Sequence, residues 1–476
     1  MSWTFLPIVI VLAVLAFIGG RAVAMRRARV AKAHSRPEQH GLYALIWVAV
    51  PALVVLIVVS LFAASFEHRL LAAGAPAEVT ALEPIRKEAF FADARRLGAG
   101  QRTQQAWEQP FAGMLPVEGQ RAARIGQTVD FAGIVAALLA AVLGGLFVFS
   151  QIRPDLRARN RVEGWVVGVL FTCSALAVLT TVGIIASLLF DATRFFAAVP
   201  IQEFLFGTQW SPQIAIRADQ VGSSGAFGAL PLFAGTFLIM LIAMAVAAPI
   251  GLFSAIYLSE YAGPAVRAIV KPLLEILAGV PTVVYGFFAA LTVGPALRAF
   301  FNRIGELLVG GPLDSLGQHL VTVQNQMALT AGLVMGIMLI PFVSSLSDDI
   351  INAVPQTLRD GSYAMGATRS ETVKRVILPA ALPGVVAALM LAISRAIGET
   401  MIVTMAAGAQ ANLTANPLDT VTTVTYQIVT LLTGDSAFDT PTTLSAFGLG
   451  LTLFVVTLVL NVIALSIVRK YREQYD

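Results

Sequence analysis

The sequence predicts an all-α polytopic membrane protein, and three observations carry that prediction. The chain has 476 residues, of which 57% are hydrophobic and only 13% are charged, and its mean hydropathy is +0.79; these values lie far outside the range of soluble domains. Nine apolar stretches are long enough to cross a bilayer. The basic residues gather in short segments beside these stretches, as membrane topology requires. The net charge of +4 therefore reflects membrane orientation, and we expect no nucleic-acid binding.

The nine apolar stretches are each read as one transmembrane helix, for which about 20 residues are needed. We expect these spans at about 3–24, 42–65, 130–151, 165–190, 229–258, 268–297, 327–350, 383–408 and 444–468. No Lys or Arg precedes the first span, whereas Arg21 and several further bases follow it. This polarity favours a retained helix with its N-terminus outside over a cleaved signal peptide.

The orientation of the other spans follows from the short basic loops. With the N-terminus outside, the basic segments all fall on the cytoplasmic side, together with the C-terminus. They are 21–36, 153–161, Arg267 with Lys271, 355–379 and 469–472. The segment 66–129 then lies outside, where its length allows it to cross regardless of charge.

We expect two domains. Residues 1–164 would form an N-terminal extension with three transmembrane helices and the external loop 66–129, and residues 165–476 a second domain with six transmembrane helices. The external loop is predicted to hold an amphipathic helix over 83–97. Its role stays open between a partner-contact module and a spacer.

The sequence lacks the common catalytic and cofactor-binding motifs. No lysine follows a glycine, so the phosphate-cradling loop of ATPases is absent, and the serine-hydrolase, zinc-protease and dinucleotide motifs are absent too. Cys173 is the only cysteine, and the four histidines are scattered without the spacing of metal ligands. We expect no catalytic residues, no metal, no cofactor and no enzymatic activity in this chain.

The polar stretch 355–379 is predicted to form two short helices around a glycine hinge. Pro355 suits a first helical position, Gly366 suits the left-handed residue that ends a helix, and Thr368 with Glu371 predicts a capping box. Pro379 is expected to stop the second helix. The pattern alone fits a DNA-binding motif or an ordinary connection as well, but its position between two apolar spans favours a docking element at the membrane edge.

The span 383–408 contains two charges, Arg395 and Glu399. A charge at the centre of a membrane costs about 3 kcal/mol on insertion scales. The spacing i, i+4 predicts that both side chains share one helix face, where they can partly compensate each other. The pair could fix helix packing or line a polar pathway, and the pathway is the favoured hypothesis.

Prolines and glycines interrupt the other later spans. Pro249, Gly251, Pro281 and Pro341 predict kinks and close contacts between helices. Such kinks occur in helices that move and in static bundles alike.

Several motifs resemble those of a known family. The run Asp360-Gly-Ser-x-x-x-Gly366, followed by ten residues and Ile377-Leu-Pro379, resembles the cytoplasmic loop of ABC-importer permeases, usually Glu-Ala-Ala-x-x-x-Gly and then Ile-x-Leu-Pro. Asp360, Gly361 and Ser362 depart from that form. The segments 204–212, 235–236, 255–261, 275–286 and 394–400 resemble the phosphate-specific permeases that form the C-type subunits of Pst importers.

The resemblance implies a type I ABC-importer permease bundle of about six helices in the bacterial inner membrane. The implied partners are a homologous second permease, two copies of a cytoplasmic ATP-binding subunit, a periplasmic phosphate-binding protein and membrane lipid. The implied ATPase-coupling residues are Asp360, Gly361, Ser362, Gly366, Ala367, Thr368, Leu378 and Pro379. The implied substrate-pathway residues are Ser394, Arg395, Glu399 and Thr400.

The predicted function is therefore that of a permease subunit that moves phosphate into the cytoplasm while a separate subunit hydrolyses ATP. A permease for another oxyanion, such as sulfate or molybdate, stays open because an arginine does not choose between them. Two alternatives from other classes are an ion-coupled transporter or channel, with Arg395 and Glu399 as a relay, and a non-transporting scaffold or sensor that works through the loop 66–129.

Overall fold

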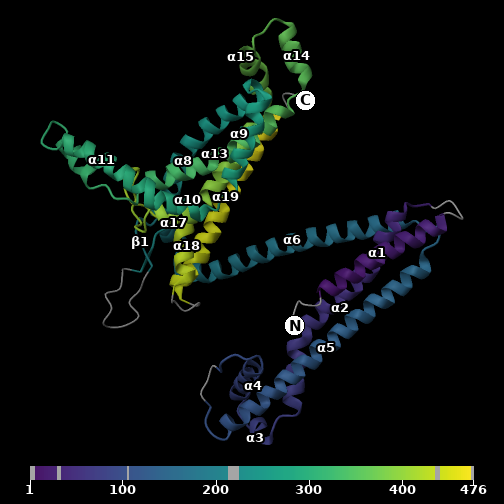
Figure 1. The fold of residues 1–476 in the computed structure, drawn as a ribbon. Helices are drawn as coiled ribbons and strands as arrows, with labels where there is room; N and C mark the ends of the chain where they lie inside the picture. The colour runs from purple at the N-terminus through teal and green to yellow at the C-terminus, as the bar shows by residue number, and fades with distance from the viewer. Residues whose placement is uncertain (1–5, 29–33, 104–106, 213–224, 435–439, 473–476) are drawn as a thin grey trace. The chain divides into compact units, whose positions relative to one another are not determined.

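The computed structural model describes residues 6–28, 34–103, 107–212, 225–434 and 440–472. By its internal contacts the chain divides into two compact units, residues 1–179 and 180–476. Helix α6 (Ala158–Ala198) runs from the first unit into the second. Figure 1 shows the helices of both units.

The first unit is built on three long helices that pack along one another, α1 (Leu6–Ala28), α2 (Pro37–Ala73) and α5 (Phe111–Gln151). It also contains the short α3 (Ala77–Thr80) and α4 (Pro84–Gly98) and the start of α6. The core between α2 and α5 uses small and branched side chains such as Val48, Ala52 and Ala141. At Gly144 a Cβ would lie 1.9 Å from the backbone oxygen of Trp47, so only glycine allows these two helices to approach this closely.

The helix predicted over 83–97 is confirmed as α4, but its expected apolar face is only partly buried, since Ile85 is 83% exposed. Its residues Phe90 and Phe91 are fully buried in a separate small core that includes the rings of Trp107 and Phe111. The loop predicted over 66–129 is shorter than expected, because α2 continues to Ala73 and α5 already begins at Phe111. A helix satisfies its own backbone hydrogen bonds in water and in lipid, so hydropathy marks the membrane edge and not the helix end.

The second unit is a helical bundle with one small antiparallel pair of strands, in which Trp210 faces Phe227. Its elements are α7 (Ile201–Phe206), β1 (Trp210–Ser211), β2 (Ala226–Phe227), α8 (Leu230–Ile256), α9 (Pro264–Ala278), α10 (Thr282–Phe288), α11 (Gly294–Leu308), α12 (Asp314–Val321), α13 (Ala328–Ala353), α14 (Gln356–Ala364), α15 (Arg369–Thr372), α16 (Leu378–Ile397), α17 (Met401–Ala406), α18 (Val424–Thr433) and α19 (Pro441–Arg472). Short π-helical turns at 289–293 and 373–377 join consecutive helices, and a third at 257–261 extends the end of α8.

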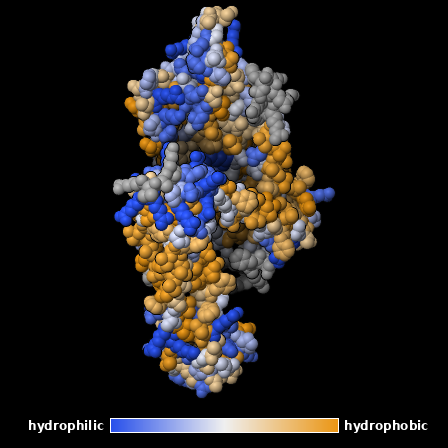
Figure 2. Space-filling model, turned by 90° about the vertical axis from the view of Figure 1, so that its right-hand side faces the viewer, coloured by the Kyte–Doolittle hydropathy of each residue, from blue (hydrophilic) through white to orange (hydrophobic). Residues whose placement is uncertain are grey.

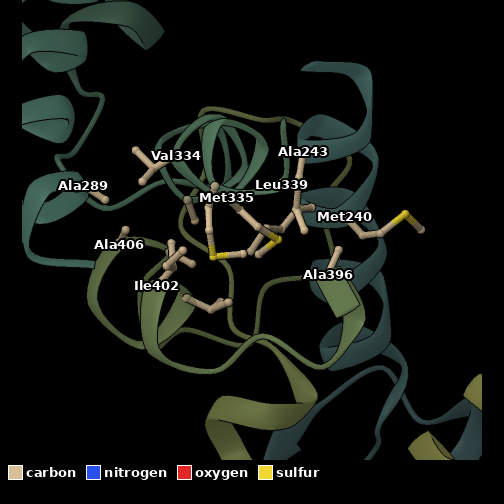
Figure 3. Packing of buried hydrophobic residues seen from close by; sticks show 14 of the residues in the cluster. Met240, Ala243, Ala289, Val334, Met335, Leu339, Ala396, Ile402 and Ala406 are labelled. Carbon is tan, nitrogen blue, oxygen red and sulfur yellow. The ribbon is translucent and has the colours of Figure 1, made fainter. Parts of the chain in front are cut away.

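Helix α13 is the centre of this bundle, and 61% of its most apolar window is buried. Figure 3 shows its Met335 and Leu339 between Ala243 of α8 on one side and Ile402 and Ala406 of α17 on the other. The close contact predicted around Pro249 and Gly251 is confirmed, because a Cβ at Gly251 would lie 2.8 Å from the Cβ of Val343.

Nine helices among the described residues are long and apolar enough to cross a membrane, which agrees with the number of spans predicted. Much of their surface is apolar, and Figure 2 shows these areas as broad orange regions separated by hydrophilic blue ones. The expected span 268–297 is wrong as one helix, since the helical course breaks at 279–281 between α9 and α10. Pro281 has no N–H group and takes an extended ψ of 137° as the N-cap of α10.

Candidate functional site

The hinge predicted within 355–379 is present. Helix α14 follows Pro355 as its N-cap, and Gly366 has a φ of +82°, a left-handed conformation that strains residues with a Cβ. The Thr368 hydroxyl accepts a hydrogen bond from the Glu371 backbone N–H at 3.3 Å, and the Glu371 carboxylate accepts one from the Thr368 N–H at 2.9 Å. This capping box starts α15 as predicted.

The expectation that Pro379 stops the second helix is wrong. The chain stays helical from Arg369 to Ile397, and Pro379 lies in the first turn of α16 directly after the π-helical turn Val373–Ile377. In a regular α-helix the proline ring would clash with the carbonyl four residues earlier. The wider π-helical turn ends just before this proline, where the helical hydrogen-bonding pattern changes. The second helix of the loop, α15, is therefore continuous with α16, which begins at Leu378.

The two short helices present an exposed surface. Leu358, Tyr363 and Met365 are 46%, 39% and 88% exposed, while the residues of the family-like motif, Asp360 and Gly361, are exposed beside them. The Ser362 hydroxyl lies 2.9 Å from that of Thr372 and so links α14 to α15. Exposed apolar side chains on a short polar loop are typical of a protein-binding surface.

Arg359 anchors this loop to the bundle, and it was not singled out in the sequence. Its Nε and Nη2 donate to Glu260 Oε1 at 3.2 and 3.0 Å, and its Nη1 and Nη2 donate to the carbonyls of Val354 and Ile351 at 2.6 and 2.7 Å. Both charged side chains are about nine-tenths buried. The guanidinium thus joins α14 to the ends of α8 and α13. The signal available in the sequence was Glu260, an acid just after the expected span 229–258, together with Arg359, a base in the segment 355–379 expected on the same side of the membrane.

The predicted shared helix face of Arg395 and Glu399 is wrong. Helix α16 ends at Ile397 with Gly398 as its C-cap, and Glu399 lies in the break before α17. The Glu399 carboxylate accepts hydrogen bonds from the backbone N–H groups of Met401 and Ile402 at 3.0 and 3.4 Å. No ion pair joins the two charges, although both belong to the described residues. Backbone donors at a helix start satisfy a carboxylate without a cation.

Arg395 instead presents its charge on the surface of this unit. It is classed as exposed, and its guanidinium carbon lies 5.5 Å from the ring centroid of Phe342. The neighbouring Ser394 and Thr400 are partly exposed. A guanidinium beside an aromatic face keeps the N–H groups in its own plane available to a carboxylate or phosphate.

A second charged cluster ties α9 to α13. Asp348, which is 2% exposed, accepts from Lys271 Nζ at 3.0 Å and from Arg267 Nη2 at 3.3 Å. Lys271 lies outside the nine spans, and its hydrogen bond to Asp348 raises the pKa of its ammonium group. A hollow of about 200 Å³ between α9 and α13 is lined by Lys271, Phe342 and Ser344 among others.

Buried hydroxyl groups surround the start of α18, and the sequence analysis missed them. Thr423 caps this helix, and Thr425 Oγ1 donates to the Glu399 carbonyl at 2.9 Å. Thr236 of α8 accepts from the Val424 N–H at 3.2 Å. Two helix starts, those of α17 and α18, therefore meet at Glu399. The threonine-rich run 420–425 was the available signal.

Among the described residues no cluster of His, Cys, Asp or Glu could hold a metal.

Two protein families match this chain. Residues 247–473, a range that includes 355–379 and Arg395, match the family described as binding-protein-dependent transport system inner membrane component. Residues 6–180 match a family described as phosphate ATP-binding cassette transporter. The helical bundle with its anchored cytoplasmic-type loop thus defines a membrane permease subunit of a binding-protein-dependent transport system.

Curated relatives narrow the family. The chain is 32% identical over 286 residues to a phosphate transport system permease protein PstC 1 of Mycobacterium bovis, covering 56% of this chain and 81% of the relative. It is 31% identical over 291 residues to PstC of Mesorhizobium japonicum, covering 61% and 85%, and 30% identical over 255 residues to the probable ABC transporter permease protein YqgH of Bacillus subtilis, covering 54% and 74%. The chain belongs to the family of PstC phosphate transport system permeases.

Proposed function

We propose that this chain is the C-type transmembrane subunit of an ATP-driven importer that moves inorganic phosphate into the cytoplasm. The observation that carries the proposal is the exposed guanidinium of Arg395, which closes an otherwise apolar membrane-spanning helix. A charged side chain on a membrane-spanning helix generally marks a functional use. Paired hydrogen bonds from one guanidinium to an oxyanion would supply that use. The chain itself is a translocation subunit, and ATP is hydrolysed by a separate subunit.

A homologous second permease would cover the face that carries Arg395. Helix α9 supports this arrangement, because none of its residues is buried in this chain. Its apolar Leu273 and Ile276 are 58% and 67% exposed and are therefore available to a partner. Phosphate would then pass between the two permeases, with Ser394, Arg395, Glu399 and Thr400 along its path. Glu399, held by backbone donors, would limit the affinity by repelling the anion, so that phosphate leaves.

Two cytoplasmic ATPases and a periplasmic phosphate-binding protein complete the proposed complex. One ATPase would grip α14 and α15 through Asp360, Gly361, Ser362, Gly366, Ala367 and Thr368. Helix α15 continues into α16 past Leu378 and Pro379. A displacement of the loop by the ATPase would therefore be transmitted along one continuous helix toward Arg395. In this proposal the N-terminus lies outside and the C-terminus lies in the cytoplasm. The permease domain comprises residues 165–476 and follows an extension at 1–164.

Reconstitution tests the proposal. The purified chain is placed in liposomes alone, and then together with the second permease, the ATPase and the phosphate-binding protein of its own genome. We expect ATP-dependent phosphate uptake only in the full complex. Uptake by the chain alone would overturn the proposal in favour of an ion-coupled transporter. Sulfate or molybdate that drives ATP hydrolysis through its own binding protein, where phosphate does not, would assign a different oxyanion.

Replacing Gly366 by proline is expected to disrupt association with the ATPase. Proline fixes φ near −65°, whereas Gly366 requires +82°, so α14 and α15 would change their relative direction. The matched control is Gly366→Asn, since asparagine tolerates the left-handed conformation and no atom of another residue lies within 4 Å of the added Cβ. Co-purification of the ATPase measures the effect. Equal recovery with both variants would contradict the role of the hinge.

A further inference from the structure

A groove in the first unit is not used by the proposed transport pathway. Its volume is about 700 Å³, and it lies between α2 and the beginning of α6. Its lining residues are Tyr43, Trp47, Arg161, Gly164, Trp165, Gly168, Val169, Thr172 and Cys173. On α6 these residues recur at spacings of three and four, so they form one helix face about 18 Å long at 1.5 Å per residue.

Glycines make the hollow. At Gly164 and Gly168 no atom lies within 4 Å of the place where a Cβ would stand, so the α6 wall is bare backbone over two turns. Trp47 and Trp165, whose ring centroids are 6.5 Å apart, form an aromatic wall beside it. The groove is therefore elongated and mainly apolar, and it lies between two helices that are long and apolar enough to cross a membrane.

One end of the groove carries a positive charge. Arg161 Nη1 donates to the Tyr43 hydroxyl and to Gln151 Oε1, both at 2.8 Å, and the guanidinium lies over the Tyr43 ring at 5.6 Å. Its other nitrogens have no protein partner in the part of the chain that the structure describes. The indole N–H of Trp47 is buried and likewise lacks a partner there. The remaining N–H groups of the exposed Arg161 are therefore the donors that a ligand in the groove can reach.

Charge around this end favours an anion. The exposed segment 153–163 holds four arginines and two acids, Asp155 and Glu163, and Glu163 already pairs with Arg159 at 2.7 Å. The segment lies where two predicted membrane spans meet a short loop, and this is the level of lipid head groups. An elongated apolar groove with one cationic end matches an amphiphile with an anionic head.

We propose that this groove binds one anionic phospholipid. Its phosphate would accept hydrogen bonds from Arg161, and an acyl chain would lie along the Gly164–Gly168 face of α6. The rings of Trp47 and Trp165 would contact the part of the acyl chain nearest the head group, as aromatic side chains do at membrane interfaces. This site is independent of the phosphate pathway and would hold whether or not the chain transports phosphate.

Native mass spectrometry of the delipidated full-length chain tests the proposal by titration with phosphatidylglycerol or with phosphatidylcholine of the same acyl chains. We expect the wild-type chain to bind phosphatidylglycerol more tightly than phosphatidylcholine. Arg161→Gln should lower the affinity for phosphatidylglycerol about fivefold, the typical contribution of one arginine at an anionic lipid surface. Gly168→Leu should weaken the binding of both lipids, because its side chain fills the groove. Arg159→Gln, which removes an equal charge outside the groove, is the matched control.

Equal phosphatidylglycerol binding by wild type, Arg161→Gln and Gly168→Leu would overturn the site, and so would an equal loss for Arg159→Gln, which would mean general charge attraction only. The single cysteine, Cys173, lies in the groove, so a benzophenone attached to it reports the occupant in native membranes. Photo-capture of phospholipid supports the proposal. Capture of a protein helix instead of lipid would show that the groove is a helix-docking surface and would overturn it.

Discussion

The Arg395→Ala variant is expected to lose phosphate uptake by roughly 10- to 100-fold while its importer complex still assembles. A hydrogen bond to a charged group contributes about 1.5–3 kcal/mol, and the guanidinium is the charged donor proposed for the pathway. Its contact in this unit is the Phe342 ring, and its side chain is exposed, so its removal leaves no buried carboxylate unpaired. Uptake of radiolabelled phosphate into proteoliposomes, with the complex quantified by size-exclusion chromatography, measures both properties.

The matched control is Arg303→Ala, since Arg303 is exposed on α11 of the same unit and outside the proposed path. It should leave uptake within twofold. Arg395→Lys should recover only part of the activity, because an ammonium group lacks the planar fork of guanidinium. Normal uptake in Arg395→Ala would remove the pathway hypothesis. Failure of assembly in that variant would instead assign Arg395 a packing role against the second permease.

The second large effect is expected for Arg359→Ala. Removing one partner of a buried ion pair destabilises by about 3–5 kcal/mol, and here Glu260 and two backbone carbonyls lose their donor together. Helix α14 should then detach from the bundle. We expect ATP hydrolysis by the complex to lose its stimulation by the phosphate-binding protein, and protease to cut within 355–368 faster than in wild type.

A double-mutant cycle separates this anchor from general damage. Glu260→Ala with Arg359→Ala should be less harmful than the sum of the two single changes, because the pair is removed as a unit. Arg369→Ala, an exposed base on the neighbouring α15, is the matched control and should keep binding-protein stimulation. Additive effects in the cycle would mean that Arg359 and Glu260 act separately, and unchanged stimulation in Arg359→Ala would contradict the anchor.

The local parts of the coupling loop could be predicted from the sequence. The left-handed Gly366 and the capping box of Thr368 and Glu371 depend on residues at most three positions apart, and such geometry follows from backbone sterics and local donors. The number of membrane-crossing helices could also be predicted, since hydropathy over about 20 residues reports it directly.

Other features required partners that are distant in the chain. Arg359 and Glu260 are separated by 99 positions, and Thr425 reaches the Glu399 carbonyl across 26. The i, i+4 spacing of Arg395 and Glu399 indicated a shared face only if the helix continued. It does not, because the chain turns at Gly398 and the carboxylate finds backbone donors at the start of α17.

Thus the sequence by itself determined the class of protein, the number of membrane-crossing helices and the hinge, because bilayer thickness and local backbone geometry act on neighbouring residues alone. Only the tertiary structure decided which charges are paired, which one stays exposed and where helices break. Those outcomes depend on which groups become neighbours after packing, and a buried charge takes whichever donor lies within hydrogen-bonding distance.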